Sequence, residues 1–311
     1  MIIISKFILI NLIIFIIILF IFLLRTLLIK NNYWYRICHS AINKDYYKFM
    51  LSDKYIAKQY GKYLGFSVPK TYQLVSNPEQ INFTNLPNNY VIKPVDLCDS
   101  TGIYLIKNNI NMINNKKICP NKIINELHDL RQTIDKTYYM YYHMYNGKIP
   151  FKGYIVEELL LDNNNNIPYD YKCYVFGGKV YFIAITYDRQ KINQKTIYKT
   201  VWMTPDWKPF YFSMSKKNYY YTNKIPKPTN LNKLIKLLEN ASIHLERHCR
   251  IDLYNINNKI YLGEFTFFCG AFLHTFLCNL ILGLIWQFNP DNNKKKLHYI
   301  DTIIPEFYTK I

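Results

Sequence analysis

The feature that most constrains this chain is an apolar run near its start. Phe7 to Leu24 reads FILINLIIFIIILFIFLL, eighteen residues of which only Asn11 is polar. At a helical rise of about 1.5 Å per residue, such a run covers the hydrocarbon core of a bilayer. It is too long for the apolar part of a cleaved signal peptide, and no small-x-small cleavage site follows Arg25. We therefore predict a transmembrane helix within an anchor of residues 1–30.

The charges around this run predict its orientation. Basic residues are more frequent after it (Arg25, Lys30, Arg36, Lys44, Lys48) than before it (Lys6 and the amino terminus). The positive-inside rule then predicts a single-pass membrane protein whose carboxyl-terminal domain is cytoplasmic. Residues 31–47, rich in tyrosine and basic side chains, are interpreted as a juxtamembrane segment lying in the headgroup region.

Composition excludes several classes of protein. The 7 cysteines of the 311 residues form no C-x-x-C pair and are odd in number, which favours a reducing compartment over a disulfide framework. The net charge of +18 is typical of polyanion binders. However, the basic residues are scattered, and the excess of Asn, Ile, Lys and Tyr reflects A/T-rich codons. No nucleic-acid partner is therefore expected.

The remaining residues, 48–311, predict one body of mixed helices and strands. Turn signals and periodicity place a helix over Asp53–Leu64 capped by Ser52, strands over Thr71–Val75, Tyr90–Lys93 and Tyr154–Glu158, a helical region over Ile123–Met144, a hairpin of Lys172–Phe176 and Val180–Tyr187 around Gly177-Gly178, and a helix over Leu231–His248. This order of elements predicts the α+β class.

A second hairpin, DLYNINNKIYLGEFT (Asp252 to Thr266), has one carboxylate on each strand. Across its tight Asn-Asn turn Asp252 and Glu264 should face each other, with the Thr266 hydroxyl on the same face as Glu264. Such a set of hard oxygen ligands suits Mg²⁺, which takes one or two carboxylates together with substrate phosphates. The alternative is that both acids are ordinary solvent-side residues.

Five collinear blocks extend this observation over the body. They are SDKYIAKQYGKYLGFSVPKTYQLV (Ser52–Val75), YVIKPVDLCDSTGIYLIK (Tyr90–Lys107), YIVEELL (Tyr154–Leu160), DYKCYVFGGKVYFI (Asp170–Ile183) and RIDLYNINNKIYLGEFTF (Arg250–Phe267). Together they resemble the ATP-grasp superfamily, and within it the TupA-like branch named for teichuronopeptide biosynthesis. The resemblance implies an ATP-grasp fold, in which two α+β subdomains clasp ATP, and the cofactors ATP and Mg²⁺.

The resemblance also implies roles for individual residues. Phosphate charge would be met by Lys58 and Lys93 and by a loop over the phosphates, Asp99–Gly102, containing Ser100 and Gly102. Adenine and ribose would be read by Glu157, Glu158, Leu159 and Leu160 and by Asp170. Lys172, Arg189 and Arg250 would be catalytic cations, and Asp252, Glu264 and Thr266 would hold the metal. The alternatives are solvated surface lysines and arginines and an exposed strand end for the two glutamates.

The chain departs from the family pattern at two places. The phosphate loop has a single glycine, Gly102, and Cys269-Gly270-Ala271-Phe272 stands where a PGSG-like run is usual. The apolar segment Ala271–Phe288 after it is expected to be a buried or membrane-resting helix rather than a second span, because His274, Asn279 and Gly283 interrupt it.

Two classes of function follow. The first is a membrane-anchored ligase that activates a carboxylate as an acyl phosphate and joins it to an amine, in surface polysaccharide or glycopeptide biosynthesis. The second is a catalytically altered nucleotide-binding or structural membrane protein, with a glycan-linked phosphotransferase or a glycosyltransferase-associated protein as further alternatives. Retention of the acids, lysines and Arg250 favours the ligase, because unused buried charges are costly. Donor and acceptor stay open.

Overall fold

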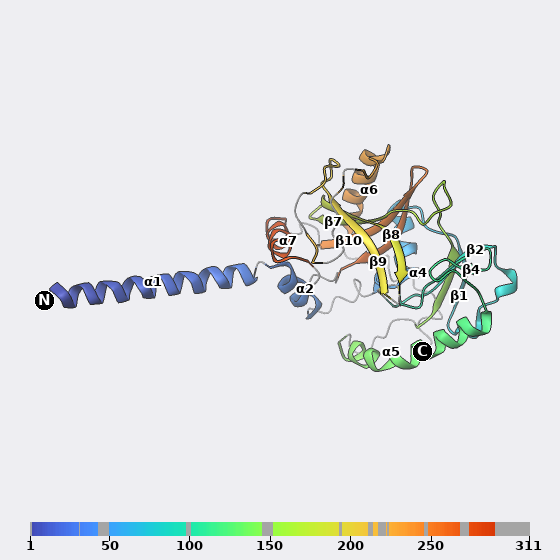
Figure 1. Ribbon diagram of the computed structural model, residues 1–311, viewed down its shortest axis with the longest axis horizontal. Helices are drawn as coiled ribbons and strands as arrows, with labels where there is room; N and C mark the ends of the chain where they lie inside the picture. Colours follow the sequence, from blue (N-terminus) through green and yellow to red (C-terminus); the bar gives the residue numbers. More distant parts are fainter. Residues whose placement is uncertain are drawn as a thin grey trace.

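A computed structural model describes residues 2–30, 32–42, 50–97, 101–144, 152–192, 195–210, 214–216, 222, 224–245, 248–267 and 274–289. Within these ranges, the side chains of residues 2–9, 26, 27, 30, 38–42, 134–144, 189–192 and 195–197 are not described. The chain forms a long amino-terminal helix and a body with two antiparallel sheets, covered by helices (Figure 1). The α+β class predicted from the order of elements is confirmed.

The apolar run lies in helix α1 (Ile2–Lys30), which extends away from the body (Figure 1). Its apolar side chains from Ile10 to Leu24 are exposed. Among the residues described, however, no helix has the length and hydropathy needed to cross a membrane. The predicted transmembrane span is therefore not supported.

The smaller sheet has the strand order β1-β6-β2-β3-β4-β5. Its strands are β1 (Thr71–Val75), β2 (Asn89–Pro94), β3 (Tyr104–Lys107), β4 (Ile110–Asn111), β5 (Lys116–Lys117) and β6 (Tyr154–Glu158), and two short 3-10 helices, η1 (Pro78–Gln80) and η2 (Phe83–Asn85), precede β2. Helix α5 (Pro120–Met144) packs Ile123 and Leu127 against Tyr90, Ile92 and Val156 of this sheet. The predicted strands β1, β2 and β6 are confirmed within one residue at each end.

The larger sheet has the order β11-β10-β7-β8-β9. Its strands are β7 (Asp170–Phe176), β8 (Lys179–Ile192), β9 (Lys195–Met203), β10 (His248–Ile256) and β11 (Lys259–Thr266). Helices α4 (Lys54–Tyr63) and α6 (Leu231–His244) cover the face that carries Cys173, Val175 and Ile251. Because side chains alternate along a strand, Lys172, Tyr174, Arg250 and Asp252 lie on the other face.

Tight turns built on asparagine or glycine close the hairpins. Asn257 and Asn258, between β10 and β11, have φ of 51° and 62°, and Asn108 and Asn109, between β3 and β4, have φ of 49° and 62°. Two successive positive φ angles give the type I′ turn that matches the twist of a hairpin, and asparagine tolerates this region better than other side chains. The predicted Asn-Asn hairpin is confirmed, as is the turn at Gly177-Gly178.

Several predicted helix ends were wrong. Helix α4 ends at Tyr63 rather than Leu64, and α5 begins at Pro120 rather than Ile123. Helix α4 begins one residue later than expected, because the carboxylate of Asp53, rather than Ser52, accepts the N–H groups of Tyr55 and Ile56 at 2.8 and 2.9 Å. Helix α6 ends at His244, and His248 already belongs to β10, where it pairs with Phe176. The apolar periodicity predicted a longer helix, but the pairing of His248 with β7 places this residue in a strand instead.

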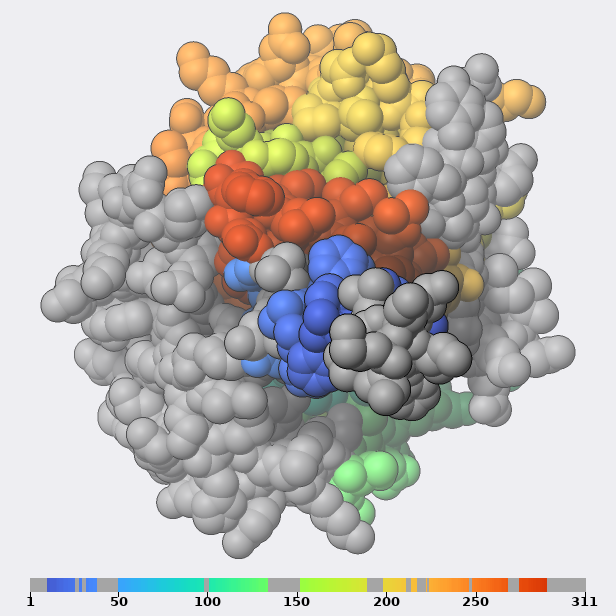
Figure 2. Space-filling view, turned by 90° about the vertical axis from the view of Figure 1, so that its left-hand side faces the viewer, coloured from blue at the N-terminus to red at the C-terminus, as the bar shows by residue number. Residues whose placement is uncertain are grey.

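The segment after the long helix packs against the body. Helix α2 (Tyr33–Ile42) lies beside α7 (Phe276–Phe288). Figure 2 shows this end of the molecule, with the residues of α1 and α2 both in blue and those of α7 in red. Tyr33 is fully buried among Phe176, His248 and Trp286. The described part of the predicted juxtamembrane segment is thus joined to the larger sheet, and most of the apolar segment Ala271–Phe288 forms a half-buried helix on that sheet.

Candidate functional site

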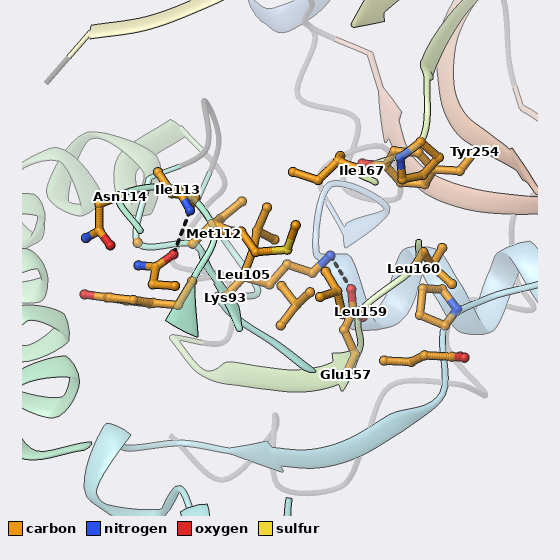
Figure 3. Close-up of a pocket in the computed structure, with 18 of the residues that line it drawn as sticks. Lys93, Leu105, Met112, Ile113, Asn114, Glu157, Leu159, Leu160, Ile167 and Tyr254 are labelled. Atoms are coloured by element: carbon orange, nitrogen blue, oxygen red, sulfur yellow. Dashed lines mark hydrogen bonds and ion pairs between the residues drawn. The ribbon is translucent and has the colours of Figure 1, made fainter. Parts of the chain in front are cut away.

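A cavity of about 880 Å³ lies between the two sheets. On one side are residues of β2, β3, β4 and β6; on the other are the segment 159–168 and Tyr254 of β10 (Figure 3). Most of the lining is apolar: Pro69, Val91, Ile103, Leu105, Met112, Ile113, Leu159, Leu160, Ile167, Pro168 and Tyr254. Charged groups, Lys93, Glu126, Glu157 and Glu158, stand among them. A ligand with a flat apolar group would fit the apolar part of this lining.

At the floor of the cavity, one carboxylate forms ion pairs with two lysines. Glu157, which is 3% exposed, lies 2.5 Å from Lys93 Nζ through its Oε1 and accepts the ammonium of Lys58 with its Oε2. Figure 3 shows the Lys93 ammonium pointing at Glu157. Burial and the charge of Lys54 lower the pKa of Lys93 to about 8, and burial and Lys93 lower the pKa of Lys58. The cluster is therefore short of negative charge and suited to an anion.

This cluster changes the interpretation of Glu157. The predicted adenine reader uses its carboxylate to hold the two predicted phosphate lysines, and Lys58 lies buried behind it rather than on the cavity wall. Glu158 and Leu160 line the cavity, and Glu158 accepts the backbone N–H of Lys70 at 3.1 Å. Lys93 and Gly102 line it too.

On the larger sheet, three neighbouring strands place their charged side chains in one row. Asp252 of β10 is paired directly with Lys172 of β7 on one side and with Glu264 of β11 on the other. The hairpin prediction that the two acids face each other is confirmed. Lys172 Nζ lies 2.7 Å from Asp252 Oδ2 and 2.9 Å from Asp170 Oδ2. Asp170 therefore orients Lys172 and is not among the residues that line the cavity.

Arg250 completes this row, two residues before Asp252 on the same face. Its Nε and Nη2 donate to the two oxygens of Asp252 at 2.7 and 2.8 Å, and Nη2 also reaches Thr266 Oγ1 at 3.1 Å. Thr266 in turn donates to Glu264 Oε1 at 3.1 Å. Although burial opposes both charges, Asp170 and Asp252 raise the pKa of Lys172, while Arg250 and Lys172 lower the pKa of Asp252. All three groups are charged at neutral pH.

The donor set of Asp252, Glu264 and Thr266 fits a hard divalent cation in part. It offers two carboxylates and a hydroxyl on one face, the number of protein ligands that Mg²⁺ takes when phosphates supply the others. The described residues contain no group of three or more His, Cys, Asp and Glu that could hold a metal without such help. The site thus fits Mg²⁺ brought by a phosphate-bearing ligand, with Glu264 the more accessible acid at 40% exposure.

The row and the cavity belong to one site. Tyr254, in the cavity wall, stands two residues after Asp252 and so lies on the same face of β10. Across the cleft, the charge of Glu264 acts on Lys93 strongly enough to contribute to its pKa. A ligand in the cavity would therefore extend its anionic end between the lysines of the smaller sheet and the acids of the larger one.

The loop that precedes β3 is described only at its end. Gly102 has φ of +69°, and a Cβ there would lie 2.7 Å from Leu130 Cδ2 and 2.9 Å from Pro94 Cγ, so no other residue fits without displacement. Ser100, the side chain of Arg189 and the segment from Cys269 to Phe272 lie outside the described residues. Their predicted roles stay predictions.

Apart from Leu159 and Leu160, which the family resemblance named, the apolar lining was not predicted from the sequence. Met112 and Ile113 follow β4, and Leu105 lies on β3, two short strands that carry too few residues for a clear alternation. Tyr254 could have been found, because it is spaced two residues from Asp252 in the hairpin that was singled out.

Comparison with known proteins gives one family and several structural neighbours. A sequence model of the family described as TupA-like ATPgrasp matches residues 35–280. A search of curated proteins finds no match. The chain is similar to a D-alanine–D-alanine ligase from Bacillus anthracis, with 14% identity over 77% of this chain and 68% of that one and a TM-score of 0.45.

Two further solved structures are similar over comparable lengths. A D-alanine–D-alanine ligase from Helicobacter pylori is 17% identical over 76% of this chain and 61% of that one, with a TM-score of 0.38. The macrocyclase MdnC from Microcystis aeruginosa, bound with precursor peptide MdnA, is 12% identical over 78% and 64%, with a TM-score of 0.40. Because these TM-scores lie below 0.5, the family assignment depends on the family match alone.

Proposed function

Because the match spans most of its length, the chain belongs to the TupA-like ATP-grasp family, and we propose that it is an ATP-dependent carboxylate–amine ligase. ATP and Mg²⁺ are its cofactors. In the proposed reaction a donor carboxylate oxygen bonds to the γ-phosphorus of ATP, the bond to the β–γ bridging oxygen breaks, and ADP leaves. The acyl phosphate then reacts with an amine. A carbon–nitrogen bond replaces the carbon–oxygen bond to phosphate, and the amine proton passes to the departing phosphate.

The observation that carries this proposal is the row of Lys172, Asp252 and Glu264, with Arg250 beside it, at the end of an apolar cavity that has a lysine cluster on its opposite wall. The cavity would hold adenine. Lys93, backed by Lys58 and Glu157, would neutralise the phosphates that enter the cleft. Phosphoryl transfer needs mainly positioning and charge stabilisation, and these residues can supply both.

The two acids would act with the metal. Asp252, Glu264 and Thr266 would hold Mg²⁺, which neutralises phosphate charge when bound. Arg250 already bridges Asp252 and Thr266, so its guanidinium would lie where charge develops on the transferring phosphoryl group. Lys172, held by Asp170, keeps Asp252 ionised and oriented.

A second candidate is a nucleotide-binding protein without turnover. The observation in its favour is that both oxygens of Asp252 are already bonded to cations, Arg250 and Lys172. If these contacts do not open, Arg250 and Lys172 compete with a metal for the oxygens of Asp252. The two candidates predict the same ATP binding and differ in whether ADP is formed.

Hydroxylamine separates the two, because this small amine intercepts an acyl phosphate as a hydroxamate. With Mg²⁺-ATP and a pool of amino acids, uronic acids and glycan-linked carboxylates, the ligase forms ADP and hydroxamate in equal amounts. Arg250→Ala should slow this by about two to three orders of magnitude while ATP affinity stays nearly unchanged, as for the loss of a group that acts mainly in the transition state. ADP with a phosphorylated sugar and no hydroxamate would instead indicate a phosphotransferase, and ATP binding without ADP would support the second candidate.

We also propose that the ligase works at a membrane, on glycans or glycopeptides of surface polysaccharide biosynthesis. The support is the row of exposed apolar side chains on α1, from Ile10 to Leu24, whose contact with water is unfavourable, and the branch of the family. Attachment through α1 with the body on the cytoplasmic side would give the site access to ATP. Protease protection of a carboxyl-terminal tag in intact cells tests the orientation: a tag cleaved from outside the cell contradicts it, and a chain recovered without membranes contradicts the attachment.

A further inference from the structure

The segment that leads away from Lys93 is held by neighbouring elements along its whole described length. The backbone N–H of Lys54, at the start of α4, donates to Val95 O at 2.8 Å, and Val95 N–H donates to Gly153 O at 2.9 Å. The Lys54 ammonium donates to the carbonyl of Leu97. The backbone between Lys93 and the phosphate loop is thereby fixed from two sides.

The strongest of these contacts is a buried ion pair with α5. Arg131 donates from Nη1 to Asp96 Oδ2 at 2.7 Å and from Nη2 to Asp96 Oδ1 at 2.6 Å. Asp96 is 0% and Arg131 13% exposed. Arg131 is itself oriented by Tyr154, whose hydroxyl accepts from Nε at 3.2 Å, and by Gly153 O at 3.3 Å. A two-point fork of this kind fixes direction as well as distance.

The same helix also meets the far end of the loop. Leu130, the neighbour of Arg131, lies where a Cβ of Gly102 would stand, together with Pro94. Lys93 and Gly102 both line the cavity and bracket this segment. One turn of α5 therefore sets the positions of both Lys93 and Gly102, although Arg131 does not line the cavity itself.

From this arrangement we infer that Arg131 and Asp96 are positioning residues for the triphosphate: the pair holds Lys93 and Gly102 at the distance that the phosphates require. The inference builds on the proposed function, because it assumes that the anion in the cleft is the triphosphate of ATP. Arg131 acts through Asp96, to whose carboxylate its guanidinium donates twice. Adenosine, which lacks phosphates, has no need of the pair.

The test compares ATP with adenosine on the whole chain. Arg131→Lys keeps the charge but loses the planar fork, and Asp96→Asn keeps the shape but loses the charge. Each should weaken ATP binding about tenfold or more, the equivalent of roughly 1.4 kcal/mol, and leave the affinity for adenosine unchanged. His128→Gln is the matched control. His128 lies on the exposed side of the same helix, where it pairs with Glu79 of η1, and its substitution should change neither affinity.

The outcomes are distinguishable. A wild-type chain that binds no ATP contradicts the proposed function. Wild-type ATP binding with equal affinity in Arg131→Lys and Asp96→Asn overturns the inference alone. A loss of ATP and adenosine binding together, or failure of both variants to fold, also overturns it, because the pair would then maintain the fold as a whole. Loss of ATP affinity with intact adenosine affinity in either variant supports it.

Discussion

The shared carboxylate of Glu157 gives a prediction whose sign depends on pH. Glu157→Gln keeps the size of the side chain and removes the one carboxylate that, within the described part of the chain, forms ion pairs with both Lys58 and Lys93. At pH 7 the ammonium of Lys93 and the neighbouring Lys58 then lack their paired carboxylate. Breaking a buried ion pair in this way usually costs about 3–5 kcal/mol.

The cost is limited here, because a lysine can lose its proton instead. The pKa of Lys93 is already lowered to about 8. At pH 7 the pKa of Lys93 can fall by only one further unit, which corresponds to about 1.4 kcal/mol, before Lys93 becomes neutral. Allowing a similar amount for the weakened hydrogen bonds of the cluster, we expect a loss of about 3 kcal/mol, which corresponds to roughly 6–12 °C in melting temperature.

At pH 10 the effect should vanish or reverse. Lys93 in the wild type is then largely neutral, and burial lowers the pKa of Lys58 in the same direction, so the buried carboxylate of Glu157 loses counter-charge and Gln becomes the better residue. Urea unfolding of both chains at pH 7 and pH 10 measures this difference. Glu158→Gln, the same change one residue along, is the control, because Glu158 is only partly buried and is expected to alter stability by less than about 1 kcal/mol.

Mg²⁺-ATP provides a second measurement at pH 7. Since the triphosphate supplies the negative charge that Gln lacks, ATP should raise the melting temperature of Glu157→Gln by more than it raises that of the wild type. A stability difference that is the same at pH 7 and pH 10, together with equal shifts by ATP, would refute the electrostatic account of this cluster.

Two further predictions use the same site. Because the pKa of Lys93 in the folded chain, about 8, is below its ordinary value of 10.5, the unfolded state binds more protons between these values, so the stability of the nucleotide-free chain should rise as the pH increases from 8 to 10.5. Over the same interval ATP affinity, followed by titration calorimetry, should fall; affinity independent of pH would exclude Lys93 as a phosphate ligand. Gly102→Ala should cost about 2–4 kcal/mol in urea unfolding, because its methyl group meets Leu130 and Pro94 at positive φ. Gly178→Ala, at φ of +85° with 3.7 Å to its nearest neighbour, has the strained backbone alone and should cost only about 1 kcal/mol; equal losses in the two variants would contradict the packing argument.

Much of the fold could be predicted because its strands carry local signals. The hairpin of β10 and β11 combines an Asn-Asn turn with alternating side chains, and these fix which residues face each other, so the opposition of Asp252 and Glu264 followed from sequence. Strand β9 and the short strands β3 to β5 were missed, since their pairing comes from neighbours rather than from their own pattern.

The contacts of the site were less predictable than its members. That Lys58 and Lys93 come close to Glu157 depends on three elements far apart in the chain, α4, β2 and β6, and no local spacing encodes it. The family resemblance gave each of these three residues a separate role and did not indicate the contacts among them. The contact between Arg250 and Asp252 was easier to predict, because the two residues lie on one face of a single strand.

The asparagine turns explain how the fold accommodates the composition of the chain. Among the described residues, six asparagines have positive φ: Asn108, Asn109, Asn115, Asn165, Asn257 and Asn258. Glycine is the usual occupant of such positions, yet the whole chain has only 10 glycines. Asparagine is the non-glycine side chain that this backbone region tolerates best, and A/T-rich codons encode it. A drift of base composition that depletes glycine can therefore be absorbed at turns with little loss of stability, and some of the glycines that stay, such as Gly102, mark places where a side chain has no room.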